Sequence, residues 1–208
     1  MLINLKILVK RYKLKNKIKG ILHVGAHECE EKSDYERFAT KNIYWVEAMK
    51  DKVQMMKERH KNINIYHAII SDQDGQEITL NISNNGQSSS ILELGTHKEK
   101  HPEVHYVAKE TSKSKTLKTL IEEEKINMNN VNFLNFDIQG AELKALKSMG
   151  DYLNKINYIY TEVNSDYLYV DCCLIGEIEE YLSVFGFKRV ETKICGITGW
   201  GDAFYLRS

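Results

Sequence analysis

The sequence predicts an α/β fold whose core is a mostly parallel sheet with helices on both faces. Short apolar runs alternate with longer polar stretches of helical character over the first 70 residues, which is typical of a parallel sheet. Two final runs are joined only by a short glycine-containing stretch, which predicts an antiparallel hairpin. With 208 residues and 42% hydrophobic side chains, the chain is large enough for one domain with a buried core.

The first third of the chain predicts three strands and two helices. Residues 20–25 form a short apolar run that ends in glycine, and residues 29–40 suit a helix. The pattern repeats with a strand over 43–48, a helix, and a third strand over 64–70. Because each strand is followed by a polar connection, we expect all three to run in the same direction.

The remainder of the chain predicts further strands and helices around one polar insertion, at about 83–115. The Asp74-Gly75 pair indicates a turn before the first of these strands. The strands are expected over 77–82, 131–136, 156–163, 187–192 and 203–207, and the helices over 117–124, 141–149 and 174–185.

Charge is unevenly distributed along the chain. The 29 basic and 29 acidic side chains cancel, which argues against a dedicated nucleic-acid binder. Seven basic residues and no acid lie within residues 1–20, so the rest of the chain has a net charge of −7. We expect a basic helical segment over 1–19, followed by a single domain over 20–208. The amphipathic part, Leu2–Lys19, either docks on a membrane or partner or is a connecting helix whose lysines face solvent.

The cysteines and the apolar runs indicate in which cellular compartment the protein is expected. Four cysteines have neither C-x-x-C spacing nor the density of a disulfide scaffold, which favours reduced thiols and a cytoplasmic protein. No run approaches the roughly 18 apolar residues of a membrane-spanning helix. The first residues mix charges with apolar side chains and do not read as a signal peptide.

Polar or small residues close several predicted strands. In an open parallel sheet, ligands bind outside the carboxyl ends of the strands, so these residues are the first site candidates. They are Gly25, Glu47, Asp72, Asp137 and Glu162.

The first three strand ends predict a cofactor that contains adenosine. The turn around Gly25 would bring backbone close to a ligand, Glu47 would accept the two ribose hydroxyls, and Asp72 would contact the adenine amino group. A structural turn at Gly25 and a solvated acid at Glu47 are the alternatives. The residues predicted to bind the cofactor are His23, Gly25, Ala26, His27, Glu47, Ala48, Ser71, Asp72 and Asp137.

The residues after Gly25 distinguish between cofactors. A nicotinamide cofactor requires further glycines for its pyrophosphate, but His27 and Glu30 occupy those places. The acids Glu28, Glu30 and Glu31 disfavour phosphates and favour the ammonium group of S-adenosylmethionine.

The chain resembles the FkbM family of S-adenosylmethionine-dependent O-methyltransferases from about residue 18 to residue 206. The resemblance implies a Rossmann-like class I methyltransferase fold with a seven-stranded sheet. Two positions depart from the family pattern, because His23 replaces a common acid and Cys29 a common glycine. The segments that carry the resemblance are 21–27, 45–48, 135–143 with its Asp-x-x-Gly-x-Glu-Leu element, 160–164 and 199–206.

Methyl transfer to a hydroxyl needs one group that accepts a proton. Asp137 is the first candidate for this base and Glu162 the second. Asp137, Glu162 and Asn164 are also a possible set of ligands for a divalent cation, although a site without metal is favoured. The structural alternative is that Asp137 caps the following helix, and Glu142 suits the start of that helix better than catalysis.

A polar loop is the candidate acceptor-binding segment, since neutral donors and acceptors suit a polyhydroxylated substrate. A flexible surface loop would look the same in the sequence. Three histidines, at 97, 101 and 105, recur every fourth residue, but Pro102 interrupts the helix that would align them for zinc. Trp200 suits either an aromatic lid or hairpin packing. The predicted acceptor-binding residues are Gln87, Ser88, Ser89, Ser90, Gln139, Asn164 and Trp200.

The resemblance and the polar loop together predict methyl transfer from S-adenosylmethionine to a sugar hydroxyl of a glycan or glycoconjugate. The basic amino-terminal segment motivates an alternative, 2′-O-methylation of RNA ribose, which the acidic remainder of the chain disfavours. A second alternative is a non-catalytic module that only retains the nucleotide pocket. The oligomeric state is left open.

Overall fold

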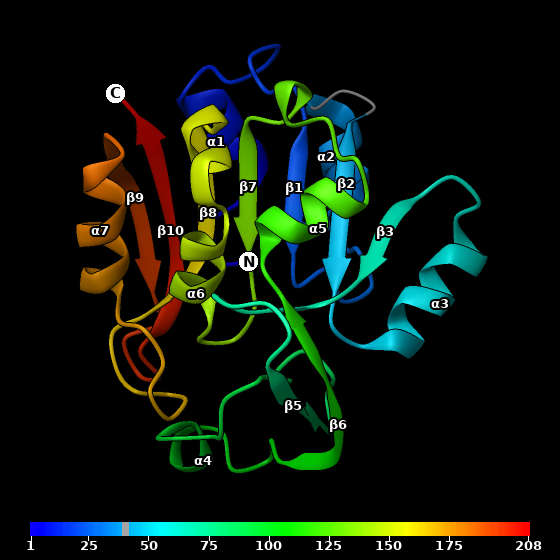
Figure 1. Cartoon of the computed structure of the whole chain (residues 1–208). Helices are drawn as coiled ribbons and strands as arrows, with labels where there is room; N and C mark the ends of the chain where they lie inside the picture. Colours follow the sequence, from blue (N-terminus) through cyan, green and yellow to red (C-terminus); the bar gives the residue numbers. More distant parts are fainter. Residues whose placement is uncertain (39–41) are drawn as a thin grey trace.

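The computed structural model describes residues 1–38 and 42–208, and a seven-stranded sheet forms its centre (Figure 1). The strands of this sheet are β1 (Ile21–Val24), β2 (Ile43–Glu47), β3 (Asn64–His67), β7 (Phe133–Phe136), β8 (Tyr158–Asn164), β9 (Phe187–Ile194) and β10 (Trp200–Arg207). Their order is β3-β2-β1-β7-β8-β10-β9. The first five are parallel, whereas β10 runs antiparallel to both β8 and β9, which confirms the predicted hairpin.

Helices cover both faces of this sheet because each presents an apolar side to it. One face packs against α5, α6 and α7, and the other against α1, α2 and α3 (Figure 1). The helices are α1 (Leu5–Arg11), α2 (Lys32–Phe38), α3 (Lys50–Arg59), α5 (Leu117–Glu123), α6 (Glu142–Ser148) and α7 (Ile175–Val184). Short 3₁₀ turns occupy Met128–Asn130 and Gly150–Lys155. The predicted helix over 29–40 begins at Lys32, and its end at Thr40 lies outside the described residues.

The basic amino-terminal segment packs on the domain through α1. The Asn4 side chain accepts the backbone N–H groups of Lys6 and Ile7 and so starts the helix. Leu5, Leu8 and Val9 of α1 belong to the same buried cluster as the α2 and α3 side of the sheet, while its lysines stay exposed. The backbone N–H groups of Leu2 and Ile3 donate to the Asp202 carboxylate on β10. No helix of the described residues is long and apolar enough to cross a membrane.

A second sheet of three strands, in the order β4-β6-β5, lies beyond the carboxyl ends of the main strands (Figure 1). Its strands are β4 (Ile69–Ile70), β5 (Glu77–Ser83) and β6 (Tyr106–Lys115), and the short helix α4 (His97–Lys100) lies between β5 and β6. The expectation of a single strand over 64–70 is wrong in this respect. The chain leaves the main sheet at Ala68, and Ile69 and Ile70 pair with Ser114 and Lys115 instead.

The register of the main sheet aligns the predicted strand ends. Val24 of β1 lies between Val46 of β2 and Phe136 of β7, so Gly25, Glu47 and Asp137 follow at the same edge. Phe136 in turn pairs with Thr161 of β8, which places Glu162 level with Asp137. Residues more than 100 positions apart in the sequence therefore meet at one site.

Candidate active site

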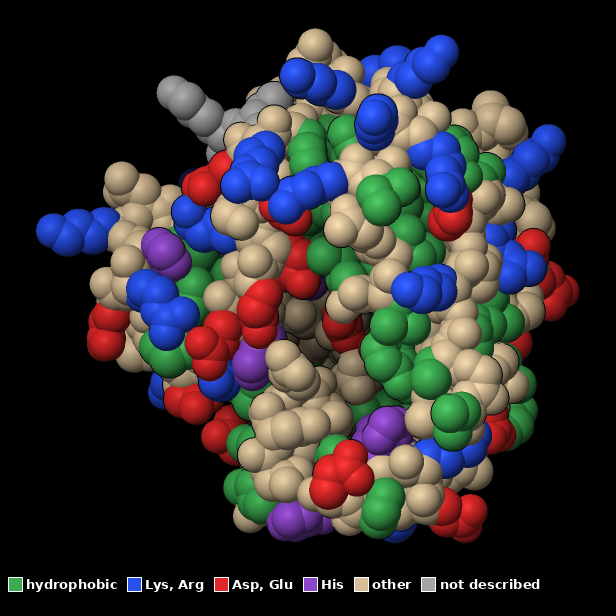
Figure 2. Space-filling view, turned by 180° about the vertical axis from the view of Figure 1, so that it is seen from behind, with side chains coloured by type: hydrophobic (Ala, Val, Ile, Leu, Met, Phe, Trp, Pro, Cys, Tyr) green, Lys and Arg blue, Asp and Glu red, His purple; other side chains and the backbone are tan. Residues whose placement is uncertain are grey.

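A cavity of about 450 Å³ opens at this edge of the sheet, a volume that suits a small molecule. Figure 2 shows the molecule hollowed here, with acidic and histidine side chains at the border of the hollow. The walls come from the ends of β1, β2, β7 and β8, from the loop after β5, and from α4 with the chain that follows it. The predicted site residues that line it are His23, Gly25, Ala26, His27, Glu47, Ala48, Gln87, Ser88, Ser89, Ser90, Asp137, Gln139, Glu162 and Trp200.

Three predicted site residues do not line the cavity. Ser71 and Asp72 lie beyond the point where the chain turns into β4, and Ala68, Ile69 and Ile70 form that wall instead. Asp72 is exposed, and its carboxylate accepts the Ser71 hydroxyl at 3.1 Å. The expectation that it contacts adenine therefore needs correction.

Asn164 also lies outside the cavity walls. Its side chain is fully buried at the end of β8, opposite Trp200 in the β10 register. The set of Asp137, Glu162 and Asn164 is therefore not gathered around one point in the cavity. Within residues 1–38 and 42–208, no three His, Cys, Asp or Glu side chains are placed to hold a metal ion together.

Gly25 is required by the packing of two strands. Its φ of +90° belongs to the left-handed region, and a Cβ at this position would lie 1.8 Å from the carbonyl oxygen of Asp137. The turn after β1 can thus approach the end of β7 only without a side chain. Gly25 is therefore needed for the turn itself, and it also lines the cavity.

Glu47 is 5% exposed and is held by backbone donors. One carboxylate oxygen accepts the N–H of His27 at 2.6 Å, and the other accepts the N–H of Met49 at 2.8 Å. Burial raises the pKa of Glu47, while these hydrogen bonds lower it. Because each carboxylate oxygen has capacity for a second hydrogen bond, the pair of oxygens can still accept two hydroxyl groups of a ligand.

The surroundings shift the pKa values of His23 and His27 in opposite directions. Burial lowers the pKa of His23 to about 4, so this ring is neutral at pH 7. His23 Nδ1 lies 3.1 Å from the Tyr35 hydroxyl, and its Nε2 has no hydrogen-bond partner. A hydrogen bond to Glu30 raises the pKa of His27, with Nδ1 at 2.7 Å from the carboxylate. Glu31, which also lines the cavity, has a pKa raised to about 7 by burial.

Asp137 and Glu162 are joined by the side-chain amide of Gln139. Nε2 of Gln139 donates to Asp137 Oδ1 at 2.7 Å and to Glu162 Oε2 at 2.7 Å. Burial raises the pKa of Glu162 well above its usual range, as do the charges of Asp137 and Glu142 and a hydrogen bond with Asp137. The buried Glu162 and the partly exposed Asp137 therefore lie side by side at the cavity wall.

The capping interpretation of Asp137 is wrong. The N-cap of α6 is Ala141, which forms no side-chain cap, and the Asp137 side chain turns to Gln139. Glu142 orders this loop instead, because its Oε1 accepts the N–H groups of Ile138 at 3.0 Å and Gly140 at 3.2 Å. Burial raises the pKa of Glu142 to about 7.

The serine side chains of the polar loop form hydrogen bonds with backbone groups of the loop and of neighbouring segments. Ser89 Oγ donates to the Gly86 carbonyl at 2.7 Å and accepts the N–H of Ser83 at 3.0 Å. Ser90 Oγ donates to the Gln139 carbonyl at 2.7 Å. The loop is consequently an ordered wall of the cavity, tied to the residue that joins the two acids.

The sequence did not identify three aromatic residues of the opposite wall. His97 and His101 of the α4 region line the cavity with 4.9 Å between ring centroids, and the His97 ring lies 5.4 Å from that of Tyr169. His97 is 5% exposed, and its Nδ1 has no partner. The four-residue spacing of the two histidines can be seen in the sequence. Their position beside Tyr169 cannot, because it depends on the pairing of Leu94 with Tyr169.

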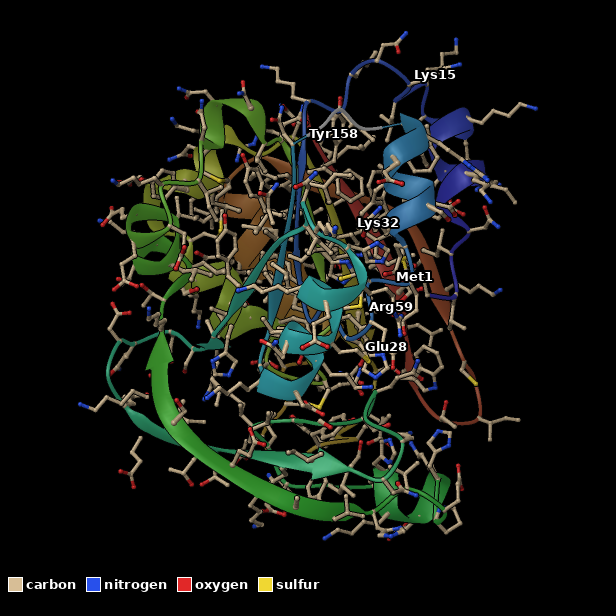
Figure 3. The ribbon with its side chains drawn as sticks, turned by 90° about the vertical axis from the view of Figure 1, so that its right-hand side faces the viewer. Met1, Lys15, Glu28, Lys32, Arg59 and Tyr158 are labelled. Atoms are coloured by element: carbon tan, nitrogen blue, oxygen red, sulfur yellow. The ribbon has the colours of Figure 1, made fainter. Side chains whose placement is uncertain are left out.

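Carboxylic acids are the most numerous ionisable side chains that line the cavity. Six carboxylate residues and four histidines line it, and no lysine or arginine does so among the described residues. Glu28 lies outside it and pairs with Lys52 at 2.7 Å and Arg59 at 3.3 Å; Figure 3 shows Glu28 beside Arg59. The acids are Glu30, Glu31, Glu47, Glu103, Asp137 and Glu162, and the histidines are His23, His27, His97 and His101.

A known protein family matches the part of the chain that contains most of the site residues. The family described as Methyltransferase FkbM domain matches residues 23–189, a span that runs from the first site residue to β9. The chain belongs to the FkbM methyltransferase family. No curated protein sequence matches the chain closely enough to count as a relative.

Solved structures similar to this FkbM methyltransferase confirm the Rossmann-like methyltransferase fold. Magnesium protoporphyrin IX methyltransferase from Synechocystis PCC 6803, with bound S-adenosylmethionine, is 10% identical with a TM-score of 0.51. The match covers 98% of this chain and 76% of that one. A putative tRNA (m1A22) methyltransferase from Streptococcus pneumoniae is also 10% identical, with a TM-score of 0.52. That match covers 100% of this chain and 71% of the other. At such identity the likeness concerns the fold.

Proposed function

We propose that this FkbM methyltransferase transfers a methyl group from S-adenosylmethionine to a hydroxyl of a neutral, polyhydroxylated acceptor, a sugar of a glycan or glycoconjugate. The observation that carries the proposal is the charge of the cavity, which has six acids and, among the described lining residues, no lysine or arginine. Such a cavity favours a donor with a sulfonium and an ammonium group and disfavours phosphates.

The donor end of the cavity fits an adenosyl group. The free hydrogen-bonding capacity of Glu47 suits the two ribose hydroxyls, and Ala68, Ile69 and Ile70 supply an apolar wall for the adenine. Glu31, half-buried beside His23, would hold the ammonium group. When bound, S-adenosylmethionine supplies an electrophilic methyl group whose sulfur leaves without charge.

The protein then has to orient the acceptor hydroxyl and remove its proton. Asp137 accepts this proton, and Glu162, whose pKa is raised by burial and by the charge of Asp137, lies beside it. The wall of His97, Tyr169 and Trp200 receives the ring of the acceptor, because aromatic faces suit a sugar. The unpartnered Nδ1 of His97 offers that ring a hydrogen bond.

RNA is the second candidate acceptor, because a solved structure of the same fold is a putative tRNA methyltransferase. The basic segment that motivates it reaches the cavity only through Met1, and none of the lysines or arginines in its described residues lines the cavity. Asn132, at the amino end of β7, accepts the N–H of Lys19 and donates to the Lys17 carbonyl, so the end of this segment lies at the opposite edge of the sheet. Figure 3 shows Lys15 and Tyr158 at that edge and Glu28 toward the other. A phosphate backbone in the cavity would meet six acidic side chains and, among the described lining residues, no lysine or arginine.

Two measurements test the proposal. Calorimetry with S-adenosylhomocysteine tests the donor, and an absence of binding refutes it. Labelled S-adenosylmethionine offered to neutral glycans and to RNA transcripts tests the acceptor. Label transferred to RNA alone, with a rate that falls steeply as salt is raised, refutes the glycan assignment.

Asp137→Asn tests the base. We expect methyl transfer to fall about 100-fold or more, because the amide cannot take the proton, while donor affinity changes little. Asp51→Asn, at an exposed position of α3, is the matched control. Unchanged turnover in Asp137→Asn would remove this residue from the role.

A further inference from the structure

We propose that Gln139 and Tyr169 are positioning residues that hold Asp137 and Glu162 together as a proton-sharing pair. The inference rests on the catalytic role proposed for this pair and assigns a task to two residues beyond it. The sequence suggested that Gln139 binds the acceptor. In the structure its amide is fully engaged by protein groups.

The hydrogen bonds fix the orientation of the Gln139 amide. The Tyr169 hydroxyl donates to Gln139 Oε1 at 2.6 Å, while its distance to the other acceptor within reach, the Ser88 carbonyl, is 3.4 Å. Nε2 of Gln139 consequently faces the acids and gives one N–H to each, both at 2.7 Å. A reversed amide would place its oxygen against two carboxyl groups and leave the phenol without its closest acceptor.

The backbone holds both residues in place. Gln139 has a φ of +56°, in the left-handed region, and its carbonyl accepts the Ser90 hydroxyl at 2.7 Å. Tyr169 is 1% exposed, and its backbone pairs with Leu94. The chain of contacts therefore runs from the acceptor wall, through Tyr169 and Gln139, to the two acids.

The pair needs neutral donors because its surroundings are acidic. Within the described residues, no lysine or arginine forms an ion pair with Asp137 or Glu162. The two N–H groups of Gln139 are then a main stabilisation of negative charge on the pair. The other titratable groups that influence Asp137 or Glu162 come from several elements: Glu142, Asp202, His23, Glu31, Tyr35, Tyr160 and Tyr169.

Tyr169→Phe removes the hydroxyl and keeps the ring against His97. The Gln139 amide is then no longer held in one orientation by the Tyr169 hydroxyl. Its N–H groups no longer point steadily at Asp137 and Glu162, so the negatively charged form of the pair is less stabilised. We expect the proton affinity of the pair to rise about tenfold. The acidic limb of the pH dependence of kcat should move to higher pH, with a lower kcat and an unchanged KM for S-adenosylmethionine. Gln139→Met, which keeps the side-chain length without the amide, should act in the same direction.

The decisive readout needs neither acceptor nor donor. Carbon-13 NMR of labelled Asp and Glu carboxyl groups follows the titration of the pair in the cofactor-free protein. Tyr167→Phe is the matched control, because that tyrosine is 53% exposed and lies two residues away. A carboxyl titration unchanged from wild type in Gln139→Met, or in a folded Tyr169→Phe, overturns the proposal. A wild-type protein that transfers no methyl group instead refutes the proposed function, while the titration still tests the pair.

Discussion

Glu142→Gln should change the pH dependence of stability in a way that the structure specifies. Glu142 is fully buried, and its Oε1 accepts the backbone N–H groups of Ile138 and Gly140. The glutamine amide oxygen can accept the same two bonds. The substitution therefore removes the ionisation while it keeps the order of the loop between β7 and α6.

The magnitude follows from the pKa of Glu142, which burial raises from 4.5 to about 7. A group with a raised folded-state pKa contributes stability that is fully present below the unfolded value, here pH 4.5. That contribution is lost as the pH rises through about 7. The difference corresponds to about 3 kcal/mol of unfolding free energy above pH 7. Wild type and variant should thus be nearly equal at pH 4.5, and the variant should be more stable at pH 8.

Urea denaturation at both pH values measures this difference in unfolding free energy. In thermal denaturation at pH 8, the melting temperature of the variant should be about 6–12 °C above that of wild type, given the size of the chain. Glu177→Gln is the matched control, because that exposed side chain also accepts a backbone N–H, from Leu174 at 2.8 Å. A stability difference between Glu142→Gln and wild type that is the same at both pH values would refute the reasoning.

Two further substitutions test the strand ends. Gly25→Ala should lower the unfolding free energy by about 3 kcal/mol or more, because its Cβ would meet the Asp137 carbonyl and its φ is positive. Denaturation should show no such loss for Gly176→Ala, where a Cβ meets nothing within 4 Å. Glu47→Gln should weaken binding of S-adenosylhomocysteine about 10- to 100-fold in calorimetry, since the charged acceptor of the ribose hydroxyls is lost. Affinity equal to that of the exposed control Glu58→Gln would contradict this role of Glu47.

The main sheet and most strand-end residues could be predicted from the sequence, because parallel strands bring their carboxyl ends to one edge. Gly25, Glu47, Asp137 and Glu162 met at the cavity for this reason. The prediction for Asp72 failed because the chain turns at Ala68 without a glycine or proline to mark the change of sheet. A local pattern cannot show that two neighbouring residues pair with different strands.

The strand β6 was missed for a different physical reason. Most of its residues are exposed, so its sequence lacks the alternation of apolar and polar side chains that marks a half-buried strand. Its order comes from pairing with β5, between Glu77–Ser83 and Tyr106–Lys115. The role of Gln139 was equally hidden, because its partner Tyr169 lies 30 positions later in the chain.

The two ends of the cavity have different structural origins, and under the proposed function this separates donor binding from acceptor choice. The proposed donor end is made by the ends of β1 and β2, whose spacing is fixed by the main sheet. The proposed acceptor end is made by the loop after β5, by the α4 region and by the chain after β8. Lys100 holds α4 there, because its Nζ contacts Asp166 and donates to the Thr198 carbonyl at 3.0 Å. Substitutions in this second group should change which acceptor is methylated and leave the affinity for the donor intact, except where they reach the acids through Tyr169 and Gln139.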